Sequence, residues 1–376
     1  MEYVKLKDLC EKEERFVAPR EDAYIDYVDI SSVDNKSKTL TKYDTYIFAE
    51  APSRARKKVM LGDVIVSTVR PNLNAVAIFN LQTTYTPIVS TGFCVLRNKS
   101  DVDPSYIYFF CTSSNFVRQM VSKATGASYP AVSDTIVREA KLPKHTAEQR
   151  ARIVTTLLKT KKIIECRRAQ LAKLDELVKC RFVELFGDPV TNPKQFPCFM
   201  LGEIVKFQGG SQPDKKHFEY ESSPHNIRLL QIRDYKSDRF VTYIPKALAK
   251  RFCSADDIMI GRYGPPIFQI LGGIEGAYNV ALMKAVPQRG NKEFIRQFLK
   301  QDCLLKYLEG LSKRTAGQDG IQMDKLKSYP FPYPPDKLQD AFAAFVQRID
   351  KLRFVIQKSL DETQTLFNSL MQQYFD

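Results

Sequence analysis

Residues 146–186 read TAEQRARIVTTLLKTKKIIECRRAQLAKLDELVKCRFVELF, and this stretch decides the fold. Thr146 with Gln149 three residues later is the pattern of a capping box, and Gly187 is a helix stop signal. Apolar residues recur in it at steps of three and four, or their sums, which predicts a narrow apolar stripe typical of a coiled-coil seam. The predicted seam consists of Ile153, Leu157, Ile164, Leu171, Leu174, Val178, Phe182 and Leu185. Roughly 40 residues at about 1.5 Å each predict a rod of about 60 Å, which we expect to separate two parts of the chain.

A second stripe of the same kind begins near Asp336, which we expect to cap its helix together with Gln339. Its predicted seam consists of Leu338, Phe342, Phe345, Ile349, Leu352 and Ile356, and Leu360, Leu366, Leu370 and Tyr374 extend it. Because a globular segment lies between the two helices, they can pair antiparallel within one chain and bury both stripes. The alternative is that each helix dimerises with another chain.

The order of local patterns in residues 1–143 recurs in residues 188–335, so the chain contains an internal repeat. The first copy shows three strand-like runs, a segment of helical spacing at 104–121 and a polar glycine-containing loop. Asp63 is followed eight residues later by Pro71, as Asp257 is by Pro265. The matching segments are 6–9 and 201–204, 63–66 and 257–260, 92–96 and 279–282, 106–107 and 294–295, and 122–130 and 312–317.

These patterns predict an α+β protein in which two similar mixed α/β domains are separated by two long helices. The helices are expected to form an antiparallel intramolecular coiled coil, with the two halves related by pseudo-two-fold symmetry. The expected divisions are a first domain at 1–143, a central helix at 144–187, a second domain at 188–335 and a distal helix at 336–376.

The net charge of +14 and the pI near 9.2 favour a polyanionic partner, nucleic acid before membrane, although such charge also serves solubility. No run approaches the roughly 18 apolar residues that span a bilayer, and the first residues lack the apolar run of a signal peptide. The eight cysteines are scattered without a CxxC pair. We therefore expect a reduced, cytoplasmic protein with mostly buried thiols and no membrane partner.

Motifs for catalysis are missing from the sequence. There is no GxGxxG, no phosphate-binding GxxxxGK[ST] and no HExxH, and the three histidines are not at metal-ligand spacing. The segment FPYPPD at 331–336 superficially resembles the Asn-Pro-Pro-aromatic motif of adenine methyltransferases but lacks its Asn. We expect no enzyme activity, metal or cofactor in this chain.

Both predicted domains carry loops that mix basic, aromatic and small polar residues, a composition suited to phosphates and base edges. In the first domain the candidates are Arg54, Arg56, Lys57, Lys58, Arg70, Lys123, Ser128 and Tyr129. In the second they are Lys215, Lys216, Arg228, Arg233, Arg262, Tyr263, Lys313, Arg314 and Gln318. For any one of these residues an ordinary solvated surface position is the simpler interpretation, and only the set, present in both copies, indicates binding.

The chain resembles the specificity subunits of Type I restriction–modification systems. The resemblance covers the whole chain and is strongest in the helical regions, at 148–154 (EQRARIV), 174–177 (LDEL), 181–189 (RFVELFGDP) and 360–362 (LDE). The second helix departs from the pattern, with Gln339-Asp340 where the first has Glu148-Gln149-Arg150.

The resemblance implies two target recognition domains, each reading one half of an asymmetric, bipartite site in double-stranded DNA. It also implies that the helices fix the spacing and bind two modification subunits, which carry S-adenosylmethionine and methylate adenine. Separate restriction subunits use ATP and Mg to translocate and cut DNA. The competing hypotheses are a coiled-coil scaffold that binds no DNA, and an enzyme in its own right.

Overall fold

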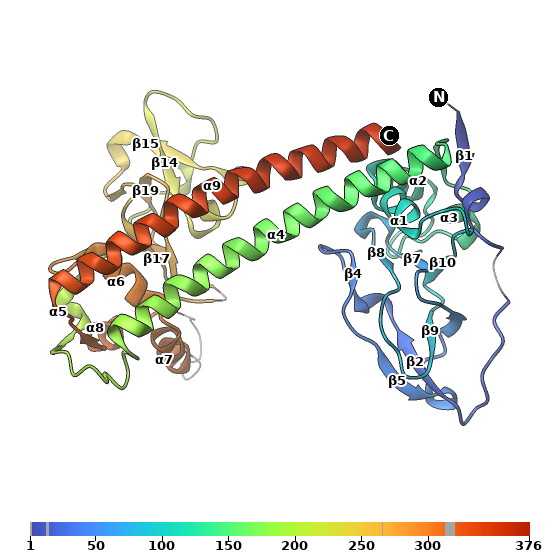
Figure 1. Cartoon of the computed structure of the whole chain (residues 1–376). Helices are drawn as coiled ribbons and strands as arrows, with labels where there is room; N and C mark the ends of the chain where they lie inside the picture. Colours follow the sequence, from blue (N-terminus) through green and yellow to red (C-terminus); the bar gives the residue numbers. More distant parts are fainter. Residues whose placement is uncertain (1, 13–14, 265, 313–319) are drawn as a thin grey trace. The chain divides into compact units, whose positions relative to one another are not determined.

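The computed structural model describes residues 2–12, 15–264, 266–312 and 320–376 (Figure 1). It comprises two compact units. Unit 1 contains Met1–Ala169 and Gln357–Asp376, and unit 2 contains Gln170–Ile356. The long helices α4, Ala147–Phe186, and α9, Asp336–Phe375, each contribute one part to each unit.

Unit 1 is built on two main sheets. One has the strand order β5-β2-β9-β6, with β2 parallel to β9, and the other has the order β10-β7-β8. The strands are β1 (Tyr3–Lys5), β2 (Tyr24–Val28), β3 (Val33–Asp34), β4 (Thr39–Leu40), β5 (Asp44–Ile47), β6 (Ala55–Lys58), β7 (Val64–Ser67), β8 (Val76–Ile78), β9 (Thr86–Ser90), β10 (Phe93–Leu96) and β11 (Lys141–Pro143). The short helices are α1 (Pro104–Thr112), α2 (Ser114–Lys123) and α3 (Asp134–Arg138). Strands β1 and β11 pair next to the start of α4.

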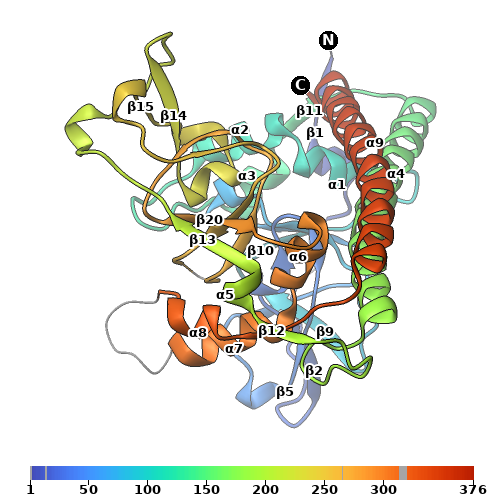
Figure 2. The same cartoon turned by 90° about the vertical axis from the view of Figure 1, so that its left-hand side faces the viewer.

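Unit 2 repeats this plan. Its sheets have the orders β15-β14-β19-β16, with β14 parallel to β19, and β13-β20-β17-β18. The strands are β12 (Cys198–Met200), β13 (Val205–Gly209), β14 (Asn226–Leu230), β15 (Tyr243–Pro245), β16 (Phe252–Cys253), β17 (Ile258–Gly261), β18 (Gln269–Leu271), β19 (Gly276–Tyr278), β20 (Leu282–Pro287) and β21 (Pro330–Pro332). The helices are α5 (Leu201–Ile204), α6 (Lys292–Leu299), α7 (Asp302–Ser312) and α8 (Met323–Lys327). Figure 2 shows β13 and β20 side by side, with α5 directly after β12.

The strand orders confirm the internal repeat. Sheet β5-β2-β9-β6 of unit 1 and sheet β15-β14-β19-β16 of unit 2 each have one parallel pair at the centre, flanked by antiparallel edge strands. The second main sheet is antiparallel in both units, with three strands in unit 1 and four in unit 2. A two-stranded pair, β1–β11 or β12–β21, closes each unit next to a long helix. The opening motifs also match: the Lys5 amide donates to Asp8 at 3.0 Å, as the Met200 amide does to Glu203 at 2.6 Å.

Two predicted elements are wrong in detail. The helical segment 104–121 is two helices, because Ser113 is extended and its hydroxyl accepts from the Phe116 amide at 3.2 Å, starting α2. The strand predicted at 279–282 begins only at Leu282, because Asn279 forms a turn in which its side chain accepts from the Ala281 amide. Pro265 and most of the loop 312–317 lie outside the described residues.

The start of α4 is confirmed as a capping box. The Thr146 amide donates to Gln149 Oε1 at 2.8 Å, and the Gln149 amide donates to Thr146 Oγ1 at 3.2 Å. Gly187 ends the helix with a φ of +76°. The predicted cap of α9 is wrong: Gln339 is buried, accepts from the Asn291 amide at 2.8 Å and donates to the Pro334 carbonyl at 2.8 Å. This side chain ties α9 to the start of α6 instead of capping its own helix.

Parts of α4 and α9 pack together within each unit and run antiparallel there. In unit 1, Arg168 donates to Gln364 at 3.3 Å, and Ile153 and Phe375 share one core. In unit 2, Arg353 pairs with Asp175 at 2.6 Å, and the rings of Phe186 and Phe342 lie 5.3 Å apart. In both units a later residue of α4 therefore meets an earlier residue of α9.

The predicted seam residues of α4 face these contacts. Ile153, Leu157, Ile164 and Val178 are buried, whereas Leu171 and Leu174 are half-buried. On α9 the buried residues include Phe342, Val346, Ile349 and Leu360, while Phe345 and Ile356 are half-buried. Leu352 is 53% exposed, so its assignment to the seam is wrong. Arg353 takes the corresponding heptad position, because its guanidinium is held by Asp175 across the helix pair.

Among the described residues, no helix is long and apolar enough to cross a membrane. None of the eight cysteines, all of which lie in the described part of the chain, forms a disulfide. Cys10, Cys94, Cys111 and Cys253 are buried, Cys303 is half-buried, and Cys166, Cys180 and Cys198 are exposed, so the expectation that most thiols are buried is wrong. Cys166 and Cys180 lie on α4, and Cys198 is the first residue of β12.

Candidate nucleic-acid interface

Two loops of unit 1 meet at Arg70 and Tyr129. Val69 and Ala131 form a β-bridge, and the Arg70 amide donates to the Pro130 carbonyl at 2.7 Å. The Arg70 guanidinium carbon lies 4.7 Å from the centre of the Tyr129 ring, which is 67% exposed. The fold thus brings together two candidates that are far apart in the sequence and presents them to solvent.

Lys123 and Ser128, the other candidates of this segment, are exposed and lie close to Tyr129 in the sequence. Lys123 is the last residue of α2, and a cation there favours the helix dipole. Both side chains are accessible to a ligand at the same loop.

Strand β6 carries the basic run of the first domain. Arg54, Arg56 and Lys58 are exposed, and the Arg56 guanidinium carbon lies 5.1 Å from the centre of the Phe48 ring. Lys57 is different because it is half-buried, forms an ion pair with Asp134 and donates to the Phe93 carbonyl at 2.7 Å. Its charge is neutralised inside the unit, so Lys57 holds β6 to α3 and β10.

Beside β6 lies a basic groove of about 790 Å³ that sequence reasoning missed. It combines the β6 lysines with cations from three other segments. These additional lining cations are Lys12, Arg15, Arg97 and Arg138. Arg97 pairs with Asp63 at 2.9 Å, and Arg138 donates to the Val95 carbonyl at 3.0 Å. Of the described residues that line this groove, none is a carboxylate. No local pattern could reveal it, because its cations are dispersed along the chain.

In unit 2 the equivalent loop pair is formed by Tyr263 and Gly320, which make a β-bridge. The Arg262 guanidinium carbon lies 5.5 Å from the Tyr263 ring centre, and Arg262 also donates to the Val280 carbonyl at 3.4 Å. Arg262 is half-buried and Tyr263 is exposed. Lys313, Arg314 and Gln318 lie outside the described residues.

Arg228 is engaged within unit 2. It projects from β14, pairs with Asp238 at 2.7 Å and lies 4.0 Å from the buried Asp234. Burial raises the pKa of Asp234, an effect that the nearby Arg228 and Arg233 partly offset. Arg228 is therefore largely neutralised by its own loop.

Arg233 contributes to an exposed aromatic site instead. The guanidinium carbons of Arg233 and Arg239 lie 5.8 Å and 5.2 Å from the ring centre of Phe240, which is 58% exposed. Arg239 and Phe240 were missed by sequence reasoning, although an Arg-Phe pair six residues after a candidate arginine was a usable signal. Lys215 and Lys216 lie earlier in unit 2 and are exposed. Lys216 Nζ lies 4.0 Å from Asp214 Oδ2.

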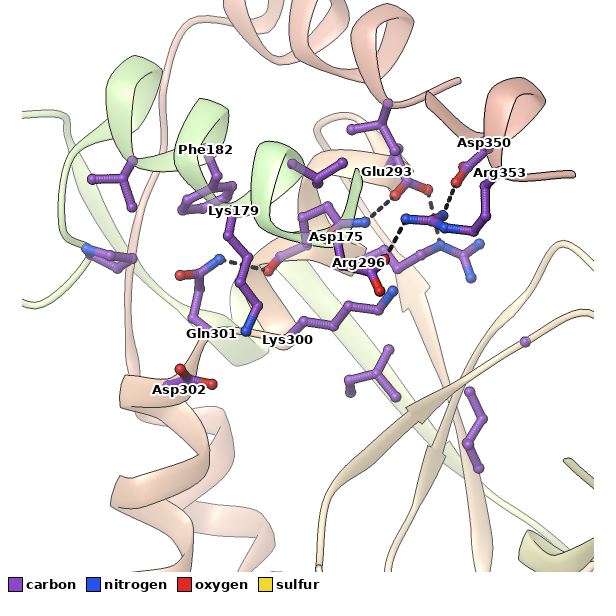
Figure 3. Close-up of a pocket in the computed structure, with 18 of the residues that line it drawn as sticks. Asp175, Lys179, Phe182, Glu293, Arg296, Lys300, Gln301, Asp302, Asp350 and Arg353 are labelled. Carbon is purple, nitrogen blue, oxygen red and sulfur yellow. Dashed lines mark hydrogen bonds and ion pairs between the residues drawn. The ribbon is translucent and has the colours of Figure 1, made fainter. Parts of the chain in front are cut away.

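A polar pocket of about 1200 Å³ lies in unit 2 between α4, α6 and α9 (Figure 3). Arg353 bridges Asp350 on its own helix and Asp175 on α4, and Arg296 pairs with Glu293 at 3.0 Å. Burial lowers the pKa of Lys300 at its edge. Across the described residues, no group of three or more His, Cys, Asp or Glu side chains could hold a metal ion. At this pocket the Arg353–Asp175 ion pair links α9 to α4.

The structure belongs to the class of α+β proteins with two repeated units and two long helices. No protein-family model matches the chain. A chain from a structure concerning complex assembly and conformational transition of the type I R-M system is similar, with a TM-score of 0.60, 22% identity and coverage of 99% of this chain and 97% of that one. The S subunit of a Type-I restriction-modification system from M. genitalium has a TM-score of 0.59 and 15% identity, over 100% of this chain and 96% of that one.

Among curated proteins, the Type I restriction enzyme MjaIX specificity subunit of Methanocaldococcus jannaschii is 20% identical over 234 residues. The aligned part is 58% of this chain and 51% of the relative, so the chain spans about half the length of this curated relative. The comparisons confirm the resemblance to Type I specificity subunits and show that this chain shares their fold.

Proposed function

We propose that this chain is the sequence-specific DNA-recognition subunit of a Type I restriction–modification complex. The observation that carries the proposal is the repeated loop pair, bridged at Val69–Ala131 in unit 1 and at Tyr263–Gly320 in unit 2. Each pair presents an arginine against a tyrosine, on a fold shared with specificity subunits. Arginine and tyrosine at a groove can read base edges, while the exposed lysines contact phosphates.

Each unit would read one half of a bipartite site. The halves should differ in sequence because the two loop pairs differ in chemistry: Arg70 is exposed, whereas Arg262 is half-buried and bonded to the Val280 carbonyl. Lys57 and Arg228, which are neutralised by Asp134 and Asp238, are expected to support these loops without touching DNA. The recognised site should therefore not be palindromic.

The two long helices would act as the spacer. In this proposal, 1–143 and 188–335 are target recognition domains, and 144–187 and 336–376 form a continuous antiparallel coiled coil with pseudo-two-fold symmetry. The antiparallel contacts found within each unit support this arrangement. The helices would also bind two modification subunits, with restriction subunits joining the same complex.

The proposal assigns no catalytic step to this chain. S-adenosylmethionine, ATP and Mg would be held by the modification and restriction subunits, and the complex would work in the cytoplasm. The chain would contribute sequence selection alone.

Methylome sequencing tests the proposal directly. The chain is expressed with and without its modification partner in a host that lacks other adenine methylation. We expect methylated adenines in one asymmetric motif with a fixed gap, only when both proteins are present. Binding of the assembly to duplex should also weaken steeply with salt, because phosphate contacts release counterions. Absence of duplex binding in every assembly would favour a protein scaffold instead.

A further inference from the structure

We propose that Arg70 is a specificity-determining residue that reads a guanine in the half-site bound by unit 1. This inference rests on the proposed function and names one base contact within it. Three observations converge on Arg70: its backbone conformation, its contact with the Tyr129 ring and the absence of an ion-pair partner for it among the described residues.

The backbone of Arg70 is strained. Its φ of +50° and ψ of +61° are left-handed, a region that residues other than glycine rarely adopt, and the following Pro71 further disfavours compact conformations. Such strain persists where surrounding contacts impose it, and it is concentrated at binding and active sites. Here the contacts are the Val69–Ala131 bridge, the bond from the Arg70 amide to the Pro130 carbonyl and the bond from the Leu73 amide to the Arg70 carbonyl at 2.9 Å. The loop therefore fixes where this side chain leaves the backbone.

The side chain is also positioned. Its guanidinium carbon lies over the Tyr129 ring, 4.7 Å from the ring centre, so the ring holds the charged group in place. Stacking uses the face and leaves the N–H donors at the edge available. A guanidinium with an open edge can donate two parallel hydrogen bonds to O6 and N7 of guanine, the commonest specific contact in the major groove.

Arg70 has no ion-pair partner among the described residues. Other arginines of unit 1 do form ion pairs. Arg97 pairs with Asp63, and Arg150 pairs with Asp101. An exposed, stacked arginine without a carboxylate keeps its full charge for a ligand. Arg262 in unit 2 is half-buried and already donates to the Val280 carbonyl, so the inference is limited to unit 1.

The test is selection from a random duplex library by the full chain assembled with its modification partner, comparing wild type with R70K, R70A and R54A. We expect a wild-type motif with one guanine in the first half-site that is preferred about ten- to a hundredfold over other bases, as good bidentate contacts allow. R70K keeps the positive charge but loses the two parallel N–H donors of the guanidinium group. The guanine preference should therefore fall below about threefold, as in R70A, while the bases at all other positions of the motif remain selected. The control R54A removes an exposed cation and should weaken all sequences alike.

Three further variants separate reading from folding. Y129A removes the stacking platform and should reduce the guanine preference, whereas Y129F keeps the ring and should retain it. R70G relieves the left-handed strain, so its melting temperature should not fall, yet its guanine preference should be lost. An unchanged motif in R70A, with a wild type that still selects its site, overturns the guanine contact alone. A wild-type assembly that selects no sequence overturns both this inference and the proposed function.

Discussion

Phe375 and Asp376 show how single side chains join the far end of the sequence to unit 1. Phe375 is fully buried, with its ring centre 5.5 Å from that of Tyr106 and 6.0 Å from that of Phe110. Asp376 accepts hydrogen bonds from Ser114 Oγ at 2.6 Å and from the Asn115 amide at 3.0 Å. A carboxylate at the start of α2 also favours the positive end of the helix dipole. The last turn of α9 is thus part of the core of unit 1.

Phe375→Ala should destabilise unit 1. The substitution leaves a cavity among aromatic rings, and we expect a loss of about 3–5 kcal/mol in the free energy of unfolding. Native-state hydrogen exchange of α1 amides measures this loss within the unit. The control Gln373→Ala changes an exposed position of the same helix and should shift stability by no more than about 0.5 kcal/mol. Equal protection of the α1 amides from exchange in Phe375→Ala and Gln373→Ala would contradict the packing of Phe375 against unit 1.

The cysteines provide a test of burial. Burial raises the pKa of Cys10 to about 12 and also raises that of Cys111, so both remain thiols at pH 8. Since the thiolate is the reactive form, iodoacetamide should label Cys166, Cys180 and Cys198 and spare Cys10, Cys94 and Cys111 until urea unfolds the chain. Peptide mass spectrometry reads the labelling. Rapid labelling of Cys111 in native protein would contradict its burial in the core of unit 1.

At the scale of the element, α9 shows why an apolar pattern alone misplaces a seam. Its inward positions step by four and three through Phe342, Val346, Ile349, Arg353 and Ile356. Sequence reasoning chose Leu352 because it is apolar, but the position facing α4 belongs to Arg353. Asp175 makes this possible, since a paired guanidinium can be half-buried at moderate cost.

A pair of alanine variants distinguishes the observed inward positions of α9 from those predicted by the sequence. Ile349→Ala should lower the free energy of unfolding by about 2–4 kcal/mol because Ile349 lies in the core of unit 2. Leu352→Ala should change it by less than about 1 kcal/mol because that side chain is mostly exposed. Urea titration followed by hydrogen exchange in α6 measures both. A larger loss of unfolding free energy in Leu352→Ala than in Ile349→Ala would support the seam predicted from the sequence.

At the scale of the whole molecule, the proposed spacer role makes a prediction about length. Inserting seven residues after Ala169 and seven after Ile356 adds one heptad to each helix and keeps both stripes in phase. Each insertion adds about 10 Å of helix, equivalent to about three base pairs. We expect the gap between methylated half-sites to grow by about three base pairs, with both half-sites unchanged.

Methylome sequencing of the insertion variant reads the gap. The matched control carries the heptad in α4 alone, which mismatches the two helices and should reduce methylation at every site. An unchanged gap in an active double insertion would refute the spacer role while leaving the recognition role intact.

Much of the organisation was predictable from local patterns. The capping box at Thr146 and Gln149 and the stop at Gly187 bound α4 correctly, because caps and left-handed glycines act within a few residues. The Leu6 and Leu201 motifs revealed the repeat for the same reason. The sheets with a central parallel pair were not predicted, because β2 and β9, like β14 and β19, pair across a long stretch of chain and leave no short-range signal.

The candidate interface was only partly predictable. Exposed, loop-borne residues such as Arg70 and Tyr129 could be nominated from composition, but their stacking depends on a bridge between distant loops. The basic groove beside β6 was missed because Lys12, Arg97 and Arg138 lie in separate segments. Lys57 and Arg228 were nominated by their charge, which carries no information about the carboxylates that neutralise them.

The sequence by itself determined the two long helices, both ends of α4 and the duplication, because helix periodicity and capping are encoded within a few turns. Only the tertiary structure decided which side chains face one another: Arg353 rather than Leu352 in the seam, Gln339 on α6 rather than at its own cap, and Arg70 on Tyr129. Those choices depend on the free energy of pairing groups from distant segments, and that free energy exists only once the chain has folded.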